Sequence, residues 1–146
     1  MDPDLPMTTT LEVRDRCLCL HVQRAARALA RRFDHALKPV DLNNGQFSIL
    51  MALNRPDPPR ISDLAPFLAM DRTTLTAALK VLERRGLAES LADESDRRNR
   101  RLRLSDGGRA LLKRAVPLWR AEHDAVDGAV GGVDAEALKG ALRRLG

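Results

Sequence analysis

The chain has 146 residues, of which 25 are Lys or Arg and 20 are Asp or Glu, so its formal net charge is +5, and 44% of its residues are hydrophobic. A chain of this length buries roughly 68–70% of its unfolded surface, so one domain can build a stable core without a disulfide or a structural metal. The composition excludes a disordered chain, and no apolar run approaches the ~20 residues that cross a bilayer. We therefore expect a soluble protein with no membrane partner.

The first ten residues and the two cysteines indicate the cellular compartment. Residues 1–10 contain acidic residues and prolines without the basic-then-apolar order of a targeting peptide, and we expect them to form a flexible arm. Cys17 and Cys19 lie too close in a helix or a strand for an easy mutual disulfide. The sequence therefore predicts a reduced, cytoplasmic protein.

The segment from Leu11 to Leu37 has the pattern of a long amphipathic helix. Its apolar residues recur mostly at steps of three or four, and Pro39 is expected to end the helix. The opposite side carries a basic stripe, which is either a solvated face or a second phosphate-facing surface. The stripe comprises Arg24, Arg27, Arg31 and Arg32.

A second helix is predicted over about residues 44–54, because Asn43 and Gln46 have the spacing of a capping box. Residues 55–59, Arg-Pro-Asp-Pro-Pro, are expected to form a rigid loop. Ser62 is the candidate cap of a short third helix, which Pro66 should distort because it lacks a backbone donor.

The fourth predicted helix follows Asp71 and runs from Arg72 to Arg85, where Gly86 ends it. The third and fourth helices together have the layout of a helix-turn-helix. Leucines of the fourth helix face inward and leave outside a short, polar and positively charged side, which suits close approach to a base edge or a phosphate. That side comprises Arg72, Thr73, Thr74, Thr76, Ala77 and Lys80.

Two strands, residues 87–92 and 100–104, are predicted on either side of a turn-rich segment. This hairpin is strongly basic, with more positive charge than the protection of a strand edge requires. A helix-turn-helix followed by a basic hairpin is a winged helix, whose helix can enter the major groove of DNA while a hairpin arginine reaches the minor groove. Five arginines fall within seven positions: Arg97, Arg98, Arg100, Arg101 and Arg103.

The C-terminal part is predicted to be helical and to pair two chains. Ser105 should cap a helix that Pro117 bends or interrupts, and Asp134 should begin a last helix. The apolar stripe of the last helix, over residues 137–145, would be wasted at the end of a monomer. We therefore expect the first and last helices to pair between the two chains of a homodimer.

Three segments make the sequence resemble the MarR family of winged-helix transcription regulators, over about residues 11–145. Residues 96–108 look like the family's wing signature of an acidic residue, paired arginines, a strand and a Thr or Ser helix start. Residues 70–76 and 82–87 look like its recognition helix and the exit from that helix. The resemblance implies a mainly α fold with a small β-hairpin wing, in which a winged helix-turn-helix is joined to a helical dimerisation region.

The resemblance also implies a division of the chain into functional parts. In order, these are residues 1–10, a flexible N-terminal arm; residues 11–40, an N-terminal dimerisation helix; residues 41–104, a winged helix-turn-helix lobe that binds DNA; and residues 105–146, C-terminal dimerisation helices.

Within the lobe, the resemblance implies roles for individual residues. Arg98 is expected to enter the minor groove, and Asp96 to orient the wing arginines. Three threonines approach the major groove, and Ala77 stands where many relatives carry an arginine. The expected DNA-binding residues are Arg72, Thr73, Thr74, Thr76, Lys80, Asp96, Arg97, Arg98 and Arg100.

The expected function is that of a homodimeric, sequence-specific regulator of transcription, a repressor on a pseudo-palindromic operator that a small aromatic or phenolic ligand releases. Double-stranded DNA is the expected partner, and binding should weaken as salt rises. The resemblance implies a ligand between the dimer helices and the DNA-binding lobe, although the same side chains also suit ordinary core packing. The candidate lining residues are His21, Phe47, Met51, Trp119 and His123.

Three alternatives stay open. Cys17 resembles in position the peroxide-reactive cysteine of the organic-hydroperoxide branch of this family, so the protein could be an oxidant-sensing repressor with His21 and two arginines near the thiol. It could instead be an architectural DNA-binding protein with little sequence preference, or a module that binds other proteins. An enzyme, a metal site and a cofactor are not expected, because the three histidines accompany no nucleophile motif or ligand spacing.

Overall fold

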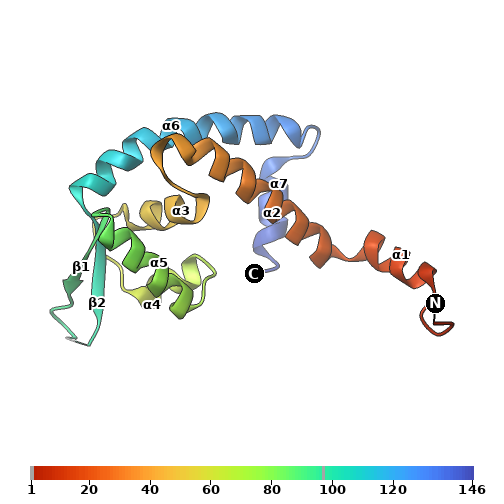
Figure 1. Cartoon of the computed structure of the whole chain (residues 1–146), viewed down its shortest axis with the longest axis horizontal. Helices are drawn as coiled ribbons and strands as arrows, with labels where there is room; N and C mark the ends of the chain where they lie inside the picture. Colours follow the sequence, from red (N-terminus) through yellow and green to blue (C-terminus); the bar gives the residue numbers. More distant parts are fainter. Residues whose placement is uncertain (1, 97) are drawn as a thin grey trace.

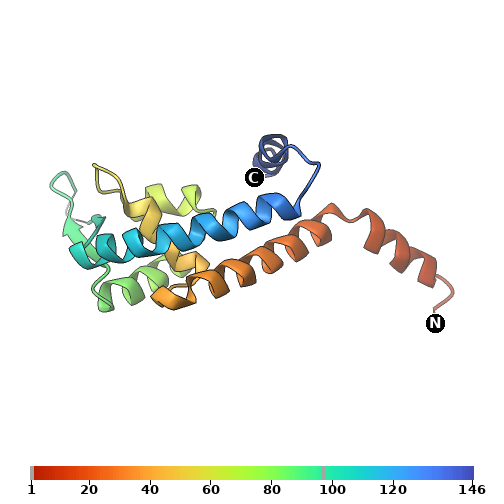
Figure 2. The same ribbon diagram turned by 90° about the horizontal axis from the view of Figure 1, so that it is seen from above.

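Figure 1 shows the computed structural model, which describes residues 2–96 and 98–146. Helices α2 and α6 lie side by side, a lobe of shorter helices and a hairpin packs against one end of this pair, and α1 and α7 lie at the other end (Figures 1 and 2). The elements are α1 (Met7–Arg16), α2 (Leu18–Leu37), the 3₁₀ turn η1 (Lys38–Val40), α3 (Asn44–Leu53), α4 (Ile61–Phe67), α5 (Arg72–Arg84), β1 (Ala88–Ala92), β2 (Arg100–Leu104), α6 (Asp106–Ala129) and α7 (Ala135–Arg143).

The N-terminal region differs from the expected flexible arm followed by one helix. Helix α1 already begins at Met7, and the helical conformation is interrupted at Cys17 before α2 begins. The break has a local cause: the backbone of Cys17 is extended, and its Sγ accepts the N–H of Leu20 at 3.4 Å as the N-cap of α2. No residue of α1 is buried, and α1 projects away from the rest of the chain (Figure 2).

Helix α3 begins as predicted, whereas the predicted cap of α4 at Ser62 is wrong. The capping box of α3 is present, since Asn43 Oδ1 accepts the N–H of Gln46 at 2.8 Å and Gln46 Oε1 accepts the N–H of Asn43 at 3.1 Å. Helix α4 begins two positions earlier than predicted, with Arg60 in place of Ser62 before its first turn, because the Asp63 carboxylate accepts the N–H of Arg60 at 3.0 Å.

A tight turn joins α4 to α5. Pro66 lies in the last turn of α4, and the helix stops one residue later. Ala69 adopts φ 51°, a left-handed conformation that reverses the chain toward α5. Asp71 caps α5 as predicted, since its Oδ1 accepts the N–H of Thr74 at 2.8 Å, and Gly86 with φ 69° ends the helix as predicted.

Aliphatic side chains from the lobe, from the end of α2 and from the first half of α6 form one core. Each such side chain contributes about 1.5–3 kcal/mol when fully buried, so their burial drives assembly of the lobe on the long helices. The largest residues that are less than 2% exposed are Leu37, Ile49, Leu50, Leu53, Leu64, Leu75, Leu82 and Leu102.

The hairpin is an antiparallel pair in which Ala88 faces Leu104 and Ala92 faces Arg100. Leu102 and Leu104 point into the core, whereas the arginines that alternate with them do not. Ser105 then caps α6 as predicted: its Oγ accepts the N–H of Gly108 at 2.9 Å.

Helix α6 is continuous through Pro117, so the predicted interruption is wrong, whereas the predicted bend agrees with the curved course of α6 in Figure 1. The proline removes one backbone donor, and contacts with α2 on its C-terminal side support the helix there. Arg32 of α2 pairs with Glu122, and the Phe33 and Trp119 rings lie 6.4 Å apart between centroids.

Substitution of Gly108 tests the packing between the hairpin and α6. A Cβ at this position would lie 2.0 Å from the carbonyl oxygen of Leu87, so Gly108→Ala should push the hairpin away and lower the free energy of unfolding by about 1–3 kcal/mol. In the matched control Gly128→Ala the new Cβ meets nothing within 4 Å, so this change should be neutral or stabilise by up to about 1 kcal/mol. Urea unfolding measures both, and equal effects would contradict the close approach.

Candidate functional site

Helix α5 turns a polar, cationic face away from the core. Leu75, Leu79 and Leu82 face inward and are at most 2% exposed. Their spacing of four and three residues places them on one side of the helix, which leaves the other side for polar residues. Thr76 is half-buried, and the other predicted contact residues of the helix are exposed: Arg72, Thr73, Thr74 and Lys80.

The three threonines of α5 differ in how their hydroxyl groups are used. Thr74 Oγ1 donates to Asp71 Oδ2 at 2.5 Å, and Thr76 Oγ1 donates to the carbonyl of Arg72 at 2.7 Å. These two oxygens therefore face outward only as acceptors, whereas nothing among the described residues accepts a bond from Thr73. The hydrogen bond from Thr74 also lowers the pKa of Asp71, so the cap of α5 is ionised at neutral pH.

Two arginines of the hairpin are held by neighbouring groups. Arg103 pairs with Glu89 on the facing strand at 2.8 Å. Arg101 turns back toward the lobe, where its Nη1 donates to the carbonyl of Pro58 at 2.8 Å. These two members of the arginine cluster therefore stabilise the hairpin and its contact with the loop before α4.

The outward-facing arginines lie in the turn of the hairpin and at the first position of β2, where Arg100 Nη2 donates to the carbonyl of Ser90 at 3.4 Å. Arg98 and Arg100 are exposed, and Arg97 lies outside the described residues. The Asp96 carboxylate accepts the backbone N–H of Arg98 and the side-chain amide of Asn99, both at 3.0 Å. Among the described residues, Asp96 thus orders the turn backbone and not an arginine side chain, because its short side chain reaches amides two and three residues ahead.

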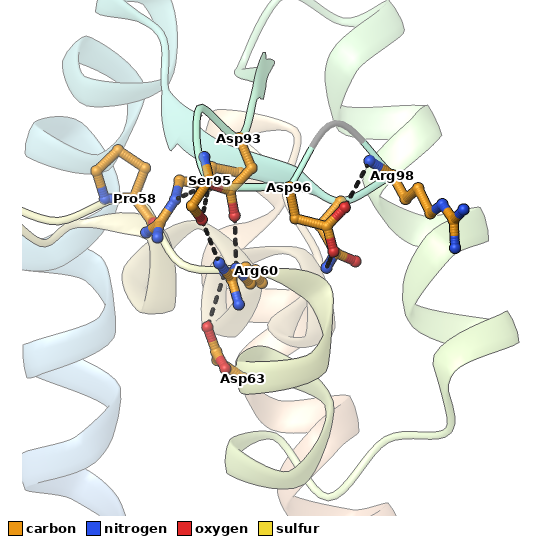
Figure 3. Close-up of polar contacts among 9 residues, drawn as sticks. Pro58, Arg60, Asp63, Asp93, Ser95, Asp96 and Arg98 are labelled. Carbon is orange, nitrogen blue, oxygen red and sulfur yellow. Dashed lines mark hydrogen bonds and ion pairs between the residues drawn. The ribbon is translucent and has the colours of Figure 1, made fainter.

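A buried carboxylate anchors the hairpin to α4 (Figure 3). Asp93 is 2% exposed, and it accepts hydrogen bonds from Arg60 Nε at 2.6 Å and from the N–H and hydroxyl of Ser95 at 3.1 and 2.8 Å. Arg60 Nη2 also donates to Ser95 Oγ at 2.9 Å. The sequence analysis missed this anchor. The Asp-x-Ser spacing was a usable signal for the turn, but no pattern links Asp93 to an arginine 33 residues earlier.

These contacts hold the pKa of Asp93 well below its usual range. The hydrogen bond from the Ser95 hydroxyl is the largest cause, and Arg60 and Arg101 add to it, while burial opposes them. The stabilisation that Asp93 contributes is therefore complete above the ordinary aspartate pKa of about 3.9 and is lost as the pH falls below that value.

The α5 face and the hairpin converge on one hollow of about 410 Å³. Thr76 lies in its wall, and Glu83 is the one carboxylate among the described lining residues. A hollow with this excess of positive charge suits an extended polyanion such as a sugar-phosphate backbone. The basic residues that line it, predicted separately from the helix and the hairpin, are Arg72, Lys80, Arg98 and Arg100.

A second cavity, of about 610 Å³, lies among α3, α4 and α6. Three of the predicted ligand residues line it: Phe47, Met51 and Trp119, with the two rings stacked at 6.1 Å between centroids. Arg55 and Arg120 add two guanidinium groups to the lining. An apolar, aromatic wall with a few polar groups is typical of a small-molecule site.

The two predicted histidines do not line this cavity. The ring of His123 packs against that of Trp119, with centroids 4.8 Å apart, and its Nδ1 lies 3.3 Å from Asp127 Oδ2. His21 is exposed in the first half of α2, roughly 24 Å along the helix from Leu37, where α2 joins the core. The sequence placed these residues on suitable helices, but it did not show how far along each helix the lobe reaches.

The cysteines are free thiols in the structure. Cys17 is half-buried at the N-cap of α2, and the two nearby arginines are already paired, Arg14 with Asp15 and Arg16 with Glu12. Within residues 2–96 and 98–146, no three His, Cys, Asp or Glu side chains are grouped so that they could hold a metal ion. No helix in the same ranges has the length and apolar character needed to span a membrane.

Comparison with solved structures gives relatives across most of the chain. The M. tuberculosis transcriptional regulator MosR in complex with DNA is 38% identical, with a TM-score of 0.81 over 89% of this chain and 93% of that one. The transcriptional repressor CouR, bound to a 23-mer DNA duplex, is 32% identical, with a TM-score of 0.80 over 92% of this chain and 94% of that one.

Sequence comparison gives a shorter match with the curated relatives. SarZ of Staphylococcus haemolyticus, an HTH-type transcriptional regulator, is 28% identical over 91 residues, which span 62% of this chain and 62% of SarZ. The sequence model of the MarR family matches residues 42–99, the segment that holds α3, α4, α5 and β1 and ends just before β2. Together with the fold and with the similarity to MosR over nearly its whole length, this match shows that the chain belongs to the MarR family of winged-helix transcriptional regulators.

Proposed function

We propose that the protein is a homodimeric, sequence-specific DNA-binding repressor that a small aromatic or phenolic ligand releases from its operator. The observation that carries this proposal is the convergence of the α5 face and the exposed hairpin arginines on one cationic hollow. In this arrangement α5 enters the major groove and Arg98 reaches the adjacent minor groove. The sugar-phosphate backbone that separates the two grooves lies along the hollow. The DNA complexes of MosR and CouR support the proposal.

The contacts of individual side chains follow from their hydrogen bonds. Thr73 can donate to a base or a phosphate, whereas Thr74 and Thr76 offer acceptor oxygens. The cations of the hollow neutralise phosphates, so affinity falls as salt rises. We assign this role to Arg72, Lys80 and Arg100 and, from its place in the sequence, to Arg97.

Exposed leucines on α7 support a homodimer. Leu138 and Leu142 of α7 are 39% and 43% exposed, and Leu145, just after the helix, is 63% exposed. Leu18 and Leu29 of α2 are exposed as well. A second copy would bury these side chains, and a two-fold dimer suits a pseudo-palindromic operator whose half-sites lie about 34 Å apart.

The cavity lined by Phe47, Met51 and Trp119 supports control by a small ligand. It lies between the lobe that carries α5 and the long helix α6, so a ligand there contacts both. To release DNA, the ligand must bind the non-DNA arrangement more tightly than the DNA-bound one. We favour control by a small ligand over oxidation of Cys17. The ligand has a cavity to bind, whereas the two arginines that could activate the Cys17 thiol are already paired with carboxylates.

Loss of Arg98 should weaken DNA binding strongly. With an operator selected from a random duplex pool, Arg98→Ala should reduce affinity by about 10- to 100-fold at fixed salt, the scale of one groove contact. Arg114→Ala removes an exposed arginine of α6 outside the hollow and should change affinity by less than about threefold. Fluorescence anisotropy measures both. Wild-type affinity for random duplexes equal to that for the selected operator would favour an architectural protein.

A charge on α7 should separate the two copies. Leu142→Asp places a carboxylate in the proposed interface and should convert a dimer into a monomer in sedimentation velocity, with loss of operator affinity. Val133→Asp is the control, since Val133 is more exposed and lies in the loop before α7. A wild-type monomer, or dissociation in both variants alike, would contradict this interface.

Trp119 is the only tryptophan of the chain and lines the cavity, so its fluorescence reports on the ligand. Titration with 4-hydroxybenzoate should give saturable quenching and release the operator. Met51→Asp puts a negative charge in the path of this anion and should abolish the quenching, whereas Met7→Asp on α1 should preserve it. Quenching that persists in Met51→Asp would place the ligand elsewhere.

A further inference from the structure

The hairpin rests on residues 58–60, the end of the proline-rich loop between α3 and α4. The N–H of Leu102 donates to the carbonyl of Pro59 at 2.9 Å, and Arg101 donates to the carbonyl of Pro58 at 2.8 Å. Because proline fixes the backbone angle φ near −65°, this support is stiff. This short, rigid segment therefore fixes the position of the hairpin relative to α4.

Asp93 stands at the base of the turn that carries Arg98 (Figure 3). Its N–H donates to the carbonyl of Asn99 at 3.3 Å, which closes the turn, while its carboxylate binds Arg60 and Ser95. A buried carboxylate that leaves its cationic partner loses much more than an exposed one, because little water replaces the lost contacts. The turn therefore has one favourable position against Arg60.

We propose that Asp93 and Arg60 are positioning residues that set the reach of Arg98 toward the minor groove. This inference rests on the DNA-binding function proposed above. Asp93 is buried, and the guanidinium of Arg60 is occupied by two acceptors, so both act through the turn. A side chain that enters a narrow groove has to be held within about 0.5 Å of its working position, which a loosely seated turn cannot do.

The sign of one substitution separates positioning from simple electrostatics. Removing a negative charge near a DNA-binding surface strengthens binding to a polyanion. Glu89→Gln removes such a charge from a half-buried site on the same hairpin, so it should leave operator affinity unchanged or raise it by up to about threefold. Asp93→Asn makes the same change of charge at the anchor, yet it should lower affinity by about tenfold, the scale of one lost charged contact.

The experiment uses full-length protein, a fluorescent operator duplex and a double-mutant cycle. In an Arg98→Ala background, Asp93→Asn should change affinity by less than about twofold, because the residue through which Asp93 acts is absent. A general loss of stability would instead lower affinity by the same factor in both backgrounds. Circular dichroism and thermal unfolding verify that each variant is folded at the assay temperature.

Ser95→Ala provides a second route if Asp93→Asn does not fold. It removes the hydroxyl that donates to Asp93 and accepts from Arg60, and it should lower affinity by about threefold, again only when Arg98 is present. Affinity of Asp93→Asn equal to that of Glu89→Gln, or full additivity with Arg98→Ala, overturns the inference and leaves the proposed function standing. A wild-type protein that binds no selected duplex overturns the proposed function itself.

Discussion

The burial of one leucine face of α5 is the constraint on which the DNA-facing surface depends. Leu75, Leu79 and Leu82 fix the rotation of the helix about its axis. A rotation by one residue, about 100°, would expose leucines and carry cations toward the core. The hairpin is tied to the same core through Leu102 and Leu104, so the two surfaces keep a fixed relation to each other.

Local and periodic features of the fold could be predicted from the sequence. The cap at Asp71, the capping box at Asn43 and the glycine after α5 involve residues at most three positions apart, which is why their spacing alone revealed them. The two strands and the outward face of α5 followed from patterns of the same short range. The break at Cys17 escaped prediction because the apolar periodicity continues across it, and only the backbone conformation shows it.

Contacts between distant parts of the chain could not be predicted in the same way. Nothing near Asp93 in the sequence indicates that Arg60 pairs with it, or that the carboxylate of Asp96 accepts the backbone N–H of Arg98. The cavity was found in part, since Phe47 and Trp119 meet there, but His21 lies too far along α2. Periodicity tells which side of a helix is apolar, and packing alone decides which turn meets which neighbour.

The unbroken course of α6 through Pro117 has a mechanical consequence. With 24 residues the helix is about 36 Å long, similar to the pitch of B-form DNA. The hairpin is attached directly to one end and α7 follows the other, so a tilt of α6 as a rigid body would be passed between these two parts. A tilt of about 5° at one end displaces the other by about 3 Å, which is large against the tolerance of a side chain fitted to a groove.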